Sequence, residues 1–155
     1  MTAKKTTQRN TKRKDFLNLG YIPPQARELE DAILGAMMLE NRCIDTVIEL
    51  LPPDAFYVEA NKRIFNAIVS LTHNGQPVDI LTVSEQLKKT GDIDIVGGSY
   101  YVTKLTNAVV SSANIEAHCK IVLQKYVQRC LIQLGGELVA EGYEDLTDAF
   151  DMIDS

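Results

Sequence analysis

The side chains that could do chemistry in this sequence are few and dispersed. The two histidines are His73 and His118. His118 precedes Cys119, but neighbouring side chains on a helix point apart and do not converge on one metal ion. Glu137 and Glu141 are one helical turn apart, a spacing that could hold a divalent cation but that a solvated helix face explains more simply. We therefore predict no catalytic residue, no metal site and no resident cofactor.

Sequence motifs for nucleotide or acyl chemistry are also missing. None of the nine glycines is followed by lysine, so the chain has no GxxxxGK[ST] phosphate loop. It has no GxSxG elbow and no CxxC pair. The aromatic pairs Phe56-Tyr57 and Tyr100-Tyr101 lack interleaved basic residues, which favours core packing over base stacking. The leading hypothesis is an interaction module, and an enzyme with a hidden acid–base pair is the weakest alternative.

Charge is distributed unevenly along the chain. Six of the sixteen Lys and Arg residues lie in residues 1–14, which contain no acid. The rest of the chain, residues 15–155, contains the other ten bases and all twenty-one acids. Phosphate contacts need clustered bases, so this acidic body argues against a nucleic-acid-binding surface. Residues 1–20 are expected to be a disordered basic arm. A helical DNA-binding regulator that uses this arm is the alternative hypothesis.

The remaining bulk features suggest a cytoplasmic protein. No run of about 18 apolar residues is present to cross a membrane. The basic N-terminus is not followed by the apolar stretch of a secretory signal. Cys43, Cys119 and Cys130 are too few and too scattered for a disulfide framework, so we interpret them as small buried hydrophobes in a reducing compartment.

Helical apolar spacing recurs along most of the chain. A first helix follows Pro23-Pro24 and ends at Asn41. Further helices are predicted over 42–51, 59–73, 79–90 and about ten residues from 100. Thr82 and Glu85 have the spacing of a capping box at the start of one of these helices. The alternating segment Asp92–Val96 has no second strand to pair with, so we predict a loop there.

The longest predicted helix covers Ala113 to Glu141, at about 1.5 Å per residue or roughly 40 Å. Its apolar positions step by three or four residues, through Ile115, Cys119, Val122, Leu123, Tyr126, Cys130, Leu134 and Leu138. A last helix, capped by Asp145 and broken off at the end of the sequence, should return antiparallel to it. Gly135-Gly136 inside the long helix suggests close helix contact or a bend, with tolerated drift as the alternative.

These elements predict an all-α fold: a compact multi-helix globular domain over 21–110, followed by a projecting antiparallel helical hairpin over 111–155. Two helices cannot cover both of their apolar faces, so self-association, at least as a dimer, is expected.

The sequence resembles the start of a bacterial DnaB-type replicative DNA helicase. Motifs in the family's order carry the resemblance over about 21–155: Pro23-Pro24-Gln25, Leu34-Gly35, Phe56-Tyr57, Arg63-Ile64-Phe65, Pro77-Val78-Asp79, Val96-Gly97-Gly98-Ser99-Tyr100-Tyr101-Val102 and Ser112-Ala113-Asn114-Ile115. The resemblance implies an N-terminal helical domain whose RecA-like ATPase domain, which would use ATP and Mg²⁺ and act on DNA, is absent from this chain. The fragment would then be non-catalytic.

The resemblance also implies partners. In the family, these domains dimerise through the hairpin, build the collar of a hexamer and recruit the C-terminal domain of primase. Tyr101, Ile115 and Ile121 match positions associated with primase binding or coupling, although core packing is an alternative for Tyr101 and Ile115. The expected dimerisation residues of the hairpin are Val122, Tyr126, Cys130, Leu134, Leu138, Leu146 and Phe150.

Overall fold

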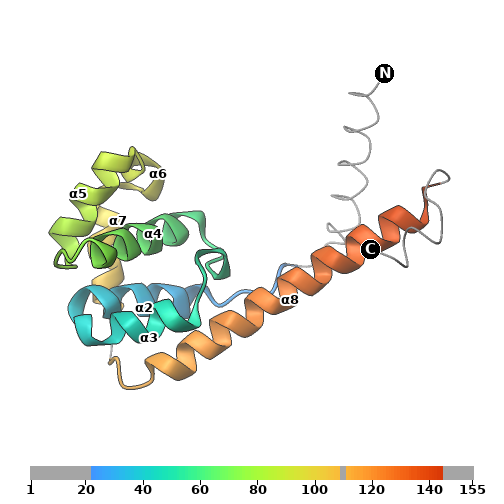
Figure 1. Ribbon diagram of the computed structural model, residues 1–155, viewed down its shortest axis with the longest axis horizontal. Coiled ribbons are helices and arrows are strands. Elements are labelled where there is room, and N and C mark those ends of the chain that lie inside the picture. The colour runs from blue at the N-terminus through green and yellow to red at the C-terminus, as the bar shows by residue number, and fades with distance from the viewer. Residues whose placement is uncertain (1–21, 109–110, 145–155) are drawn as a thin grey trace. The chain divides into compact units, whose positions relative to one another are not determined.

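The computed structural model describes residues 22–108 and 111–144, and within them the chain is all-α, as predicted. Helices and two 3₁₀ turns make up these ranges, and neither contains a strand. The elements are α2 Arg27–Leu39, η1 Asn41–Cys43, α3 Ile44–Leu50, η2 Pro53–Ala55, α4 Glu59–His73, α5 Ile80–Thr90, α6 Ile93–Val96, α7 Gly98–Asn107 and α8 Ile115–Gly142 (Figure 1). The predicted basic arm and the last helix of the predicted hairpin, with Leu146 and Phe150, lie outside the described residues.

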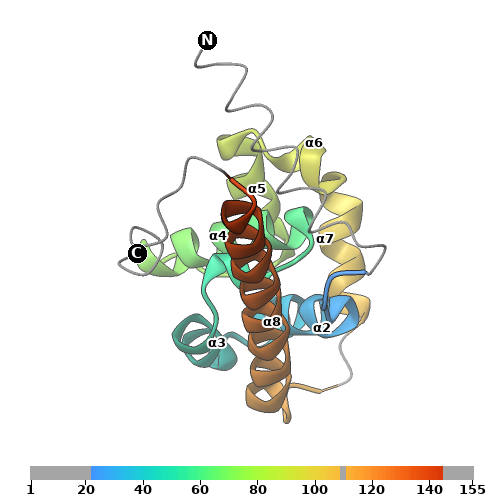
Figure 2. The same ribbon diagram turned by 90° about the vertical axis from the view of Figure 1, so that its right-hand side faces the viewer.

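The chain divides into two compact units. Residues 25–126, the globular unit, contain α2 to α7 and the first turns of α8. In Figures 1 and 2, α2 and α3 lie at one end of this unit and α5 and α6 at the other, with α4 between them. The second unit comprises residues 1–24 and 127–155, of which the structure describes 22–24 and 127–144, including the rest of α8.

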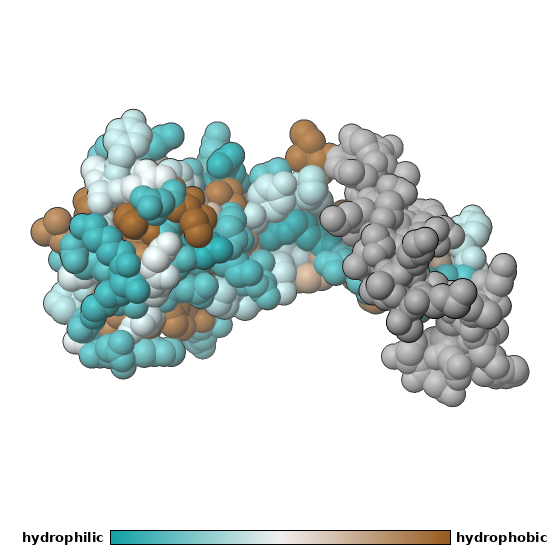
Figure 3. Space-filling view, turned by 90° about the horizontal axis from the view of Figure 1, so that it is seen from above, coloured by the Kyte–Doolittle hydropathy of each residue, from teal (hydrophilic) through white to brown (hydrophobic). Residues whose placement is uncertain are grey.

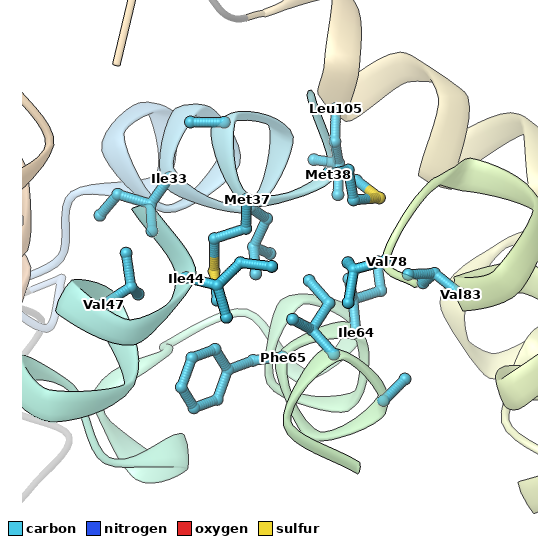
Figure 4. Close-up of a cluster of buried hydrophobic side chains, with 14 of the residues drawn as sticks. Ile33, Met37, Met38, Ile44, Val47, Ile64, Phe65, Val78, Val83 and Leu105 are labelled. Atoms are coloured by element: carbon cyan, nitrogen blue, oxygen red, sulfur yellow. The ribbon is translucent and has the colours of Figure 1, made fainter. Parts of the chain in front are cut away.

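The core of the globular unit is made by the apolar faces that the sequence spacing predicted. Ile33 and Met37 of α2, and Ile64 and Ile68 of α4, are each fully buried. Figure 4 shows side chains from several helices converging on this cluster. Phe65 packs against another aromatic ring, that of Phe56, with ring centroids 4.8 Å apart. On the face drawn in Figure 3, hydrophobic residues of this unit form separate patches among hydrophilic ones.

The capping box of helix α5 begins three residues earlier than predicted, at Asp79 instead of Thr82. Asp79 is the N-cap: its carboxylate accepts from the Thr82 backbone N–H at 2.9 Å, and the Thr82 hydroxyl oxygen accepts from the Asp79 N–H at 2.9 Å. Glu85 lies a full turn inside the helix and pairs with Lys88 instead. The short Asp side chain on an extended residue reaches the free N–H groups, which a residue already inside the helix cannot do.

The segment predicted as a loop contains one turn of helix, α6. Glycines in the left-handed conformation precede and follow it, Gly91 at φ +77° and Gly97 at φ +103°. Within the turn Val96 is buried while Ile95 is exposed. A single turn satisfies some of its backbone groups locally and needs no partner strand, and its four residues are too few to show a helical period, so the segment was predicted as a loop.

Helix α8 is one continuous helix from Ile115 to Gly142, close to the predicted limits. Cys119 and Val122 of its first turns are buried in the globular core. From Val127 onward large apolar side chains are exposed on its surface. The helix therefore has a first part that belongs to the globular core and a second part, within the other unit, whose apolar residues are largely accessible.

Candidate interaction surface

No group of three or more His, Cys, Asp or Glu side chains in the described residues could hold a metal ion. Within the same ranges no helix is long and apolar enough to span a membrane. The features described below are the exposed apolar side chains of α8 and the polar contacts that position α7 and the start of α8.

Tyr101 belongs to a hydrogen-bond network linking three helices. Its hydroxyl donates to Asn61 Oδ1 on α4 at 2.7 Å. The Asn61 amide in turn donates to Asp31 Oδ1 of α2 at 2.9 Å. Burial is the main cause that raises the pKa of the Tyr101 phenol. The Tyr101 hydroxyl is thus used within the fold, and its half-buried ring packs against the core.

The buried Glu30 carboxylate belongs to the same hydrogen-bond network. This carboxylate is only 1% exposed. It accepts from the backbone N–H groups of Tyr57 at 3.0 Å and Val58 at 3.3 Å, and from the Asn61 amide at 3.4 Å. It therefore binds the chain just before α4, where backbone donors lack helical partners. Neither Glu30 nor Asn61 was predicted as a key residue, because an acid near a helix start is normally explained by the helix dipole.

The two isoleucines matched to the primase-associated positions differ in accessibility. Ile115 is partly buried against the globular core. Ile121 is 40% exposed and is not part of that cluster. Of the three residues, Tyr101 and Ile115 thus pack on the same core, and Ile121 is the one most available to a partner. Their role in partner binding stays a prediction.

The connection into α8 is tied to the end of α2. The Glu40 carboxylate accepts from the Ser112 hydroxyl and, at 3.0 Å, from the Arg42 guanidinium. The hydrogen bond from Ser112 is the main cause that lowers the pKa of the Glu40 carboxyl, and the bond from Arg42 lowers it further. Ser111, rather than Ser112, accepts the backbone N–H of Ala113 at 3.1 Å. The two serines before α8 therefore position its start by two different contacts.

The predicted dimerisation residues separate into two sets. Val122 is 1% exposed and Tyr126 packs against the same core, so both stabilise the globular unit itself. Cys130, Leu134 and Leu138 are exposed. Leu134 and Leu138, at 53% and 47% exposure, remain candidates for contact with a partner.

Further exposed apolar residues on α8 were missing from the sequence prediction. They are Val127 (47%), Leu131 (62%), Ile132 (48%) and Val139 (46%), and Tyr143 (72%) follows directly after the end of the helix. The predicted stripe ran from Tyr126 through Cys130 to Leu138 in steps of four residues. Each such step turns about 40° more than a full turn of the helix, so the predicted stripe winds around α8 and leaves these residues out. Continuing the core-facing side straight along the helix would instead reach Gln133 and Glu137. The exposed apolar face is therefore a separate face.

Comparison with known proteins assigns the fold to a family. The family model for the DnaB-like helicase N terminal domain matches residues 22–124. The chain is 43% identical over 135 residues to the replicative DNA helicase DnaB of Rhodothermus marinus, covering 87% of this chain and 14% of that protein. It is 37% identical over 139 residues to the replicative DNA helicase DnaC of Bacillus subtilis, covering 90% of this chain and 30% of that one. The chain thus spans less than a third of these relatives.

Solved structures agree with this assignment. The N-terminal domain of DnaB helicase from Mycobacterium tuberculosis superposes with a TM-score of 0.82 at 32% identity, covering 86% of this chain and 94% of that one. The N-terminal domain of DnaB helicase from Helicobacter pylori, described together with its interactions with primase, has the same fold, with a TM-score of 0.68 at 21% identity over 76% of this chain and 92% of that one. The chain therefore belongs to the DnaB-like replicative helicases and corresponds to their N-terminal domain.

Proposed function

We propose that this chain is a non-catalytic assembly and recruitment domain of a replicative helicase. It associates with further copies of itself through the second part of α8, and it recruits primase during DNA replication. ATP, Mg²⁺ and DNA are handled by a motor domain of the intact helicase and not by this chain.

The observation that carries self-association is the exposed apolar face of α8. Val127, Leu131, Leu134 and Leu138 follow one another by steps of four, three and four residues, the repeat of a helix seam that packs on another helix. Each of these side chains is about half exposed or more. Contiguous apolar patches of more than a few hundred Å² mark interaction sites on soluble proteins.

Self-association is tested by sedimentation equilibrium of the chain and of Leu131→Asp. We expect the parent chain to be at least dimeric at tens of micromolar, and the variant to shift to monomer because a buried carboxylate at a helix seam is costly. Gln133→Asp adds the same charge at an exposed position outside the apolar face and should leave the association unchanged. A parent chain that stays monomeric would refute this part of the proposal.

Primase recruitment is supported by family membership and by the interactions with primase described for the Helicobacter pylori domain. Within this chain, Ile121 is the most accessible of the residues matched to primase-associated positions. Its exposed side chain projects from the part of α8 that the globular core holds in place. A partner could therefore bury it without disturbing the fold.

The test is titration of the chain with the C-terminal domain of primase, followed by calorimetry. Ile121→Asp should weaken binding by about tenfold or more, the scale of one apolar contact replaced by a desolvated charge. Asn66→Asp, an exposed position on α4, is the matched control and should bind as the parent does. If Ile121→Asp binds as tightly as Asn66→Asp, Ile121 lies outside the interface.

A further inference from the structure

The second part of α8 contains a notch in its apolar face at Gly135. A Cβ built at this position would meet no atom within 4 Å. The four positions one turn before and after it, residues 131, 132, 138 and 139, carry the large apolar side chains Leu131, Ile132, Leu138 and Val139. All four are between 46% and 62% exposed. Gly135 therefore leaves a gap that is surrounded by four accessible apolar side chains.

The backbone of α8 does not require a glycine here. Gly75, Gly91, Gly97 and Gly98 have positive φ angles, which explains why glycine stands at those positions. Gly135 lies inside a continuous helix and has no such angle. In that setting glycine weakens the helix relative to alanine. Close approach of another backbone is the physical reason for which a glycine is useful on an exposed helix face.

We propose that Gly135 is the crossing point at which the α8 helix of a second copy of this chain packs, glycine against glycine across a two-fold axis. This inference rests on the proposed self-association and identifies its centre. A two-fold contact places the same notch on both partners, so two glycines face each other and the framing side chains of each helix pack around the other.

The width of the apolar face calls for more than one packing partner. At about 100° per residue, the exposed apolar positions between Val127 and Val139 extend over roughly 160° of the helix circumference, whereas a helix packed on one neighbour needs an apolar stripe of about 100°.

The charges along α8 favour an antiparallel crossing. Lys120, Lys125 and Arg129 precede the notch, whereas Glu137, Glu141 and Glu144 follow it. Two parallel helices in register would place acids level with acids, while an antiparallel pair centred on Gly135 places the acidic part of each helix level with the basic part of the other. The distribution of charge along α8 therefore favours a second copy of this chain in the antiparallel orientation.

Replacement of Gly135 by leucine gives opposite results under the two explanations. If the notch is the crossing point, Gly135→Leu holds the helices apart and the dimer dissociation constant rises by at least about tenfold. If the face is apolar without close approach, the added leucine enlarges it and the dimer tightens. Gln133→Leu, which adds the same side chain at an exposed position off this face, is the matched control and should change the constant by less than about twofold.

Sedimentation equilibrium at several salt concentrations measures these constants, with helical circular dichroism as the check that each variant is folded. Tightening or no change in Gly135→Leu, in a parent that dimerises and that Leu131→Asp makes monomeric, would overturn the notch while leaving self-association intact. A lowered melting temperature at every concentration with an unchanged dimer constant would assign the notch to the chain's own C-terminal segment. The antiparallel geometry predicts a weaker dimer at high salt, and a dimer that tightens with salt would exclude it.

Discussion

At the scale of single residues, the most constrained polar group of the globular unit is the Glu30 carboxylate. A carboxylate is tolerated in an apolar core only when hydrogen bonds replace its hydration. Here both oxygens are used: Oε2 accepts from Tyr57 N–H and Oε1 from Val58 N–H and the Asn61 amide. Because Asn61 also accepts from the Tyr101 hydroxyl, the carboxylate supports the position of α7 through one intermediate.

We expect Glu30→Gln to lower the free energy of unfolding by about 1–3 kcal/mol, because the amide NH₂ would replace one of two acceptors and face a backbone donor. Glu28→Gln, at an exposed position in the same first turn, should change it by less than about 0.5 kcal/mol. Urea denaturation followed by circular dichroism measures both. Equal effects in the two variants would mean that Glu30 contributes only to the helix dipole.

This network also marks where sequence reasoning at the residue scale stops. Glu30 and Asn61 are thirty-one positions apart, and nothing in either local pattern indicates that they meet. Tyr101 could be matched to a family position, but its internal hydrogen bond to Asn61 becomes evident only once α4 and α7 are packed together. Long-range polar pairing depends on the tertiary arrangement, which helical periodicity does not encode.

At the scale of elements, α5 begins where a short side chain can cap it. The Asp79 carboxylate and the Thr82 side chain each bind the other's backbone N–H, so both ends of the box are satisfied. The start of α5 thereby positions the buried Val83 and Leu87 toward the core. Losing the cap should destabilise the helix start without removing any core side chain.

Asp79→Ala should therefore lower the free energy of unfolding by about 1 kcal/mol, the usual contribution of an N-cap. Glu85→Gln discriminates between the two possible capping boxes. It removes only an exposed ion pair with Lys88 and should cost less than about 0.5 kcal/mol. Thermal denaturation of the two variants gives the comparison, and a larger loss in Glu85→Gln would restore the capping box first expected from the sequence.

The elements differ in how far the sequence could define them. Helix α4 has its predicted limits, Glu59–His73, and Asn74-Gly75 ends it where the sequence indicated. The four residues of α6 are too few to reveal a helical period, so that turn was missed. In α8 the length was predictable, but the face was not. Deciding which turns belong to the core requires knowing that Cys119 and Val122 pack there, and that Val127 and Leu131 do not.

At the scale of the whole molecule, the all-α fold and the family could both be inferred from the sequence, because local periodicity and ordered motifs survive without tertiary information. The interaction surface could be inferred only in outline. A dimerisation role for the end of the long helix remains a proposal, and the structure narrows its described candidates from a stripe that includes the buried Val122 to an exposed face around Gly135.

The charge distribution separates this proposal from that of a DNA-binding regulator. Outside residues 1–14 the chain has ten bases against twenty-one acids, so duplex DNA should be repelled by everything except the basic arm. We expect no mobility shift of duplex DNA at about 150 mM salt, either with the full chain or with the chain lacking residues 1–14, and at most an arm-dependent shift at low salt.

Titration with the C-terminal domain of primase should be unaffected by the deletion of residues 1–14, because Ile121 and the face around Gly135 lie elsewhere in the sequence. A shift that persists at 150 mM salt and disappears on removing the arm would favour the regulator, and retained primase binding in the same preparation would show that the two activities are separable.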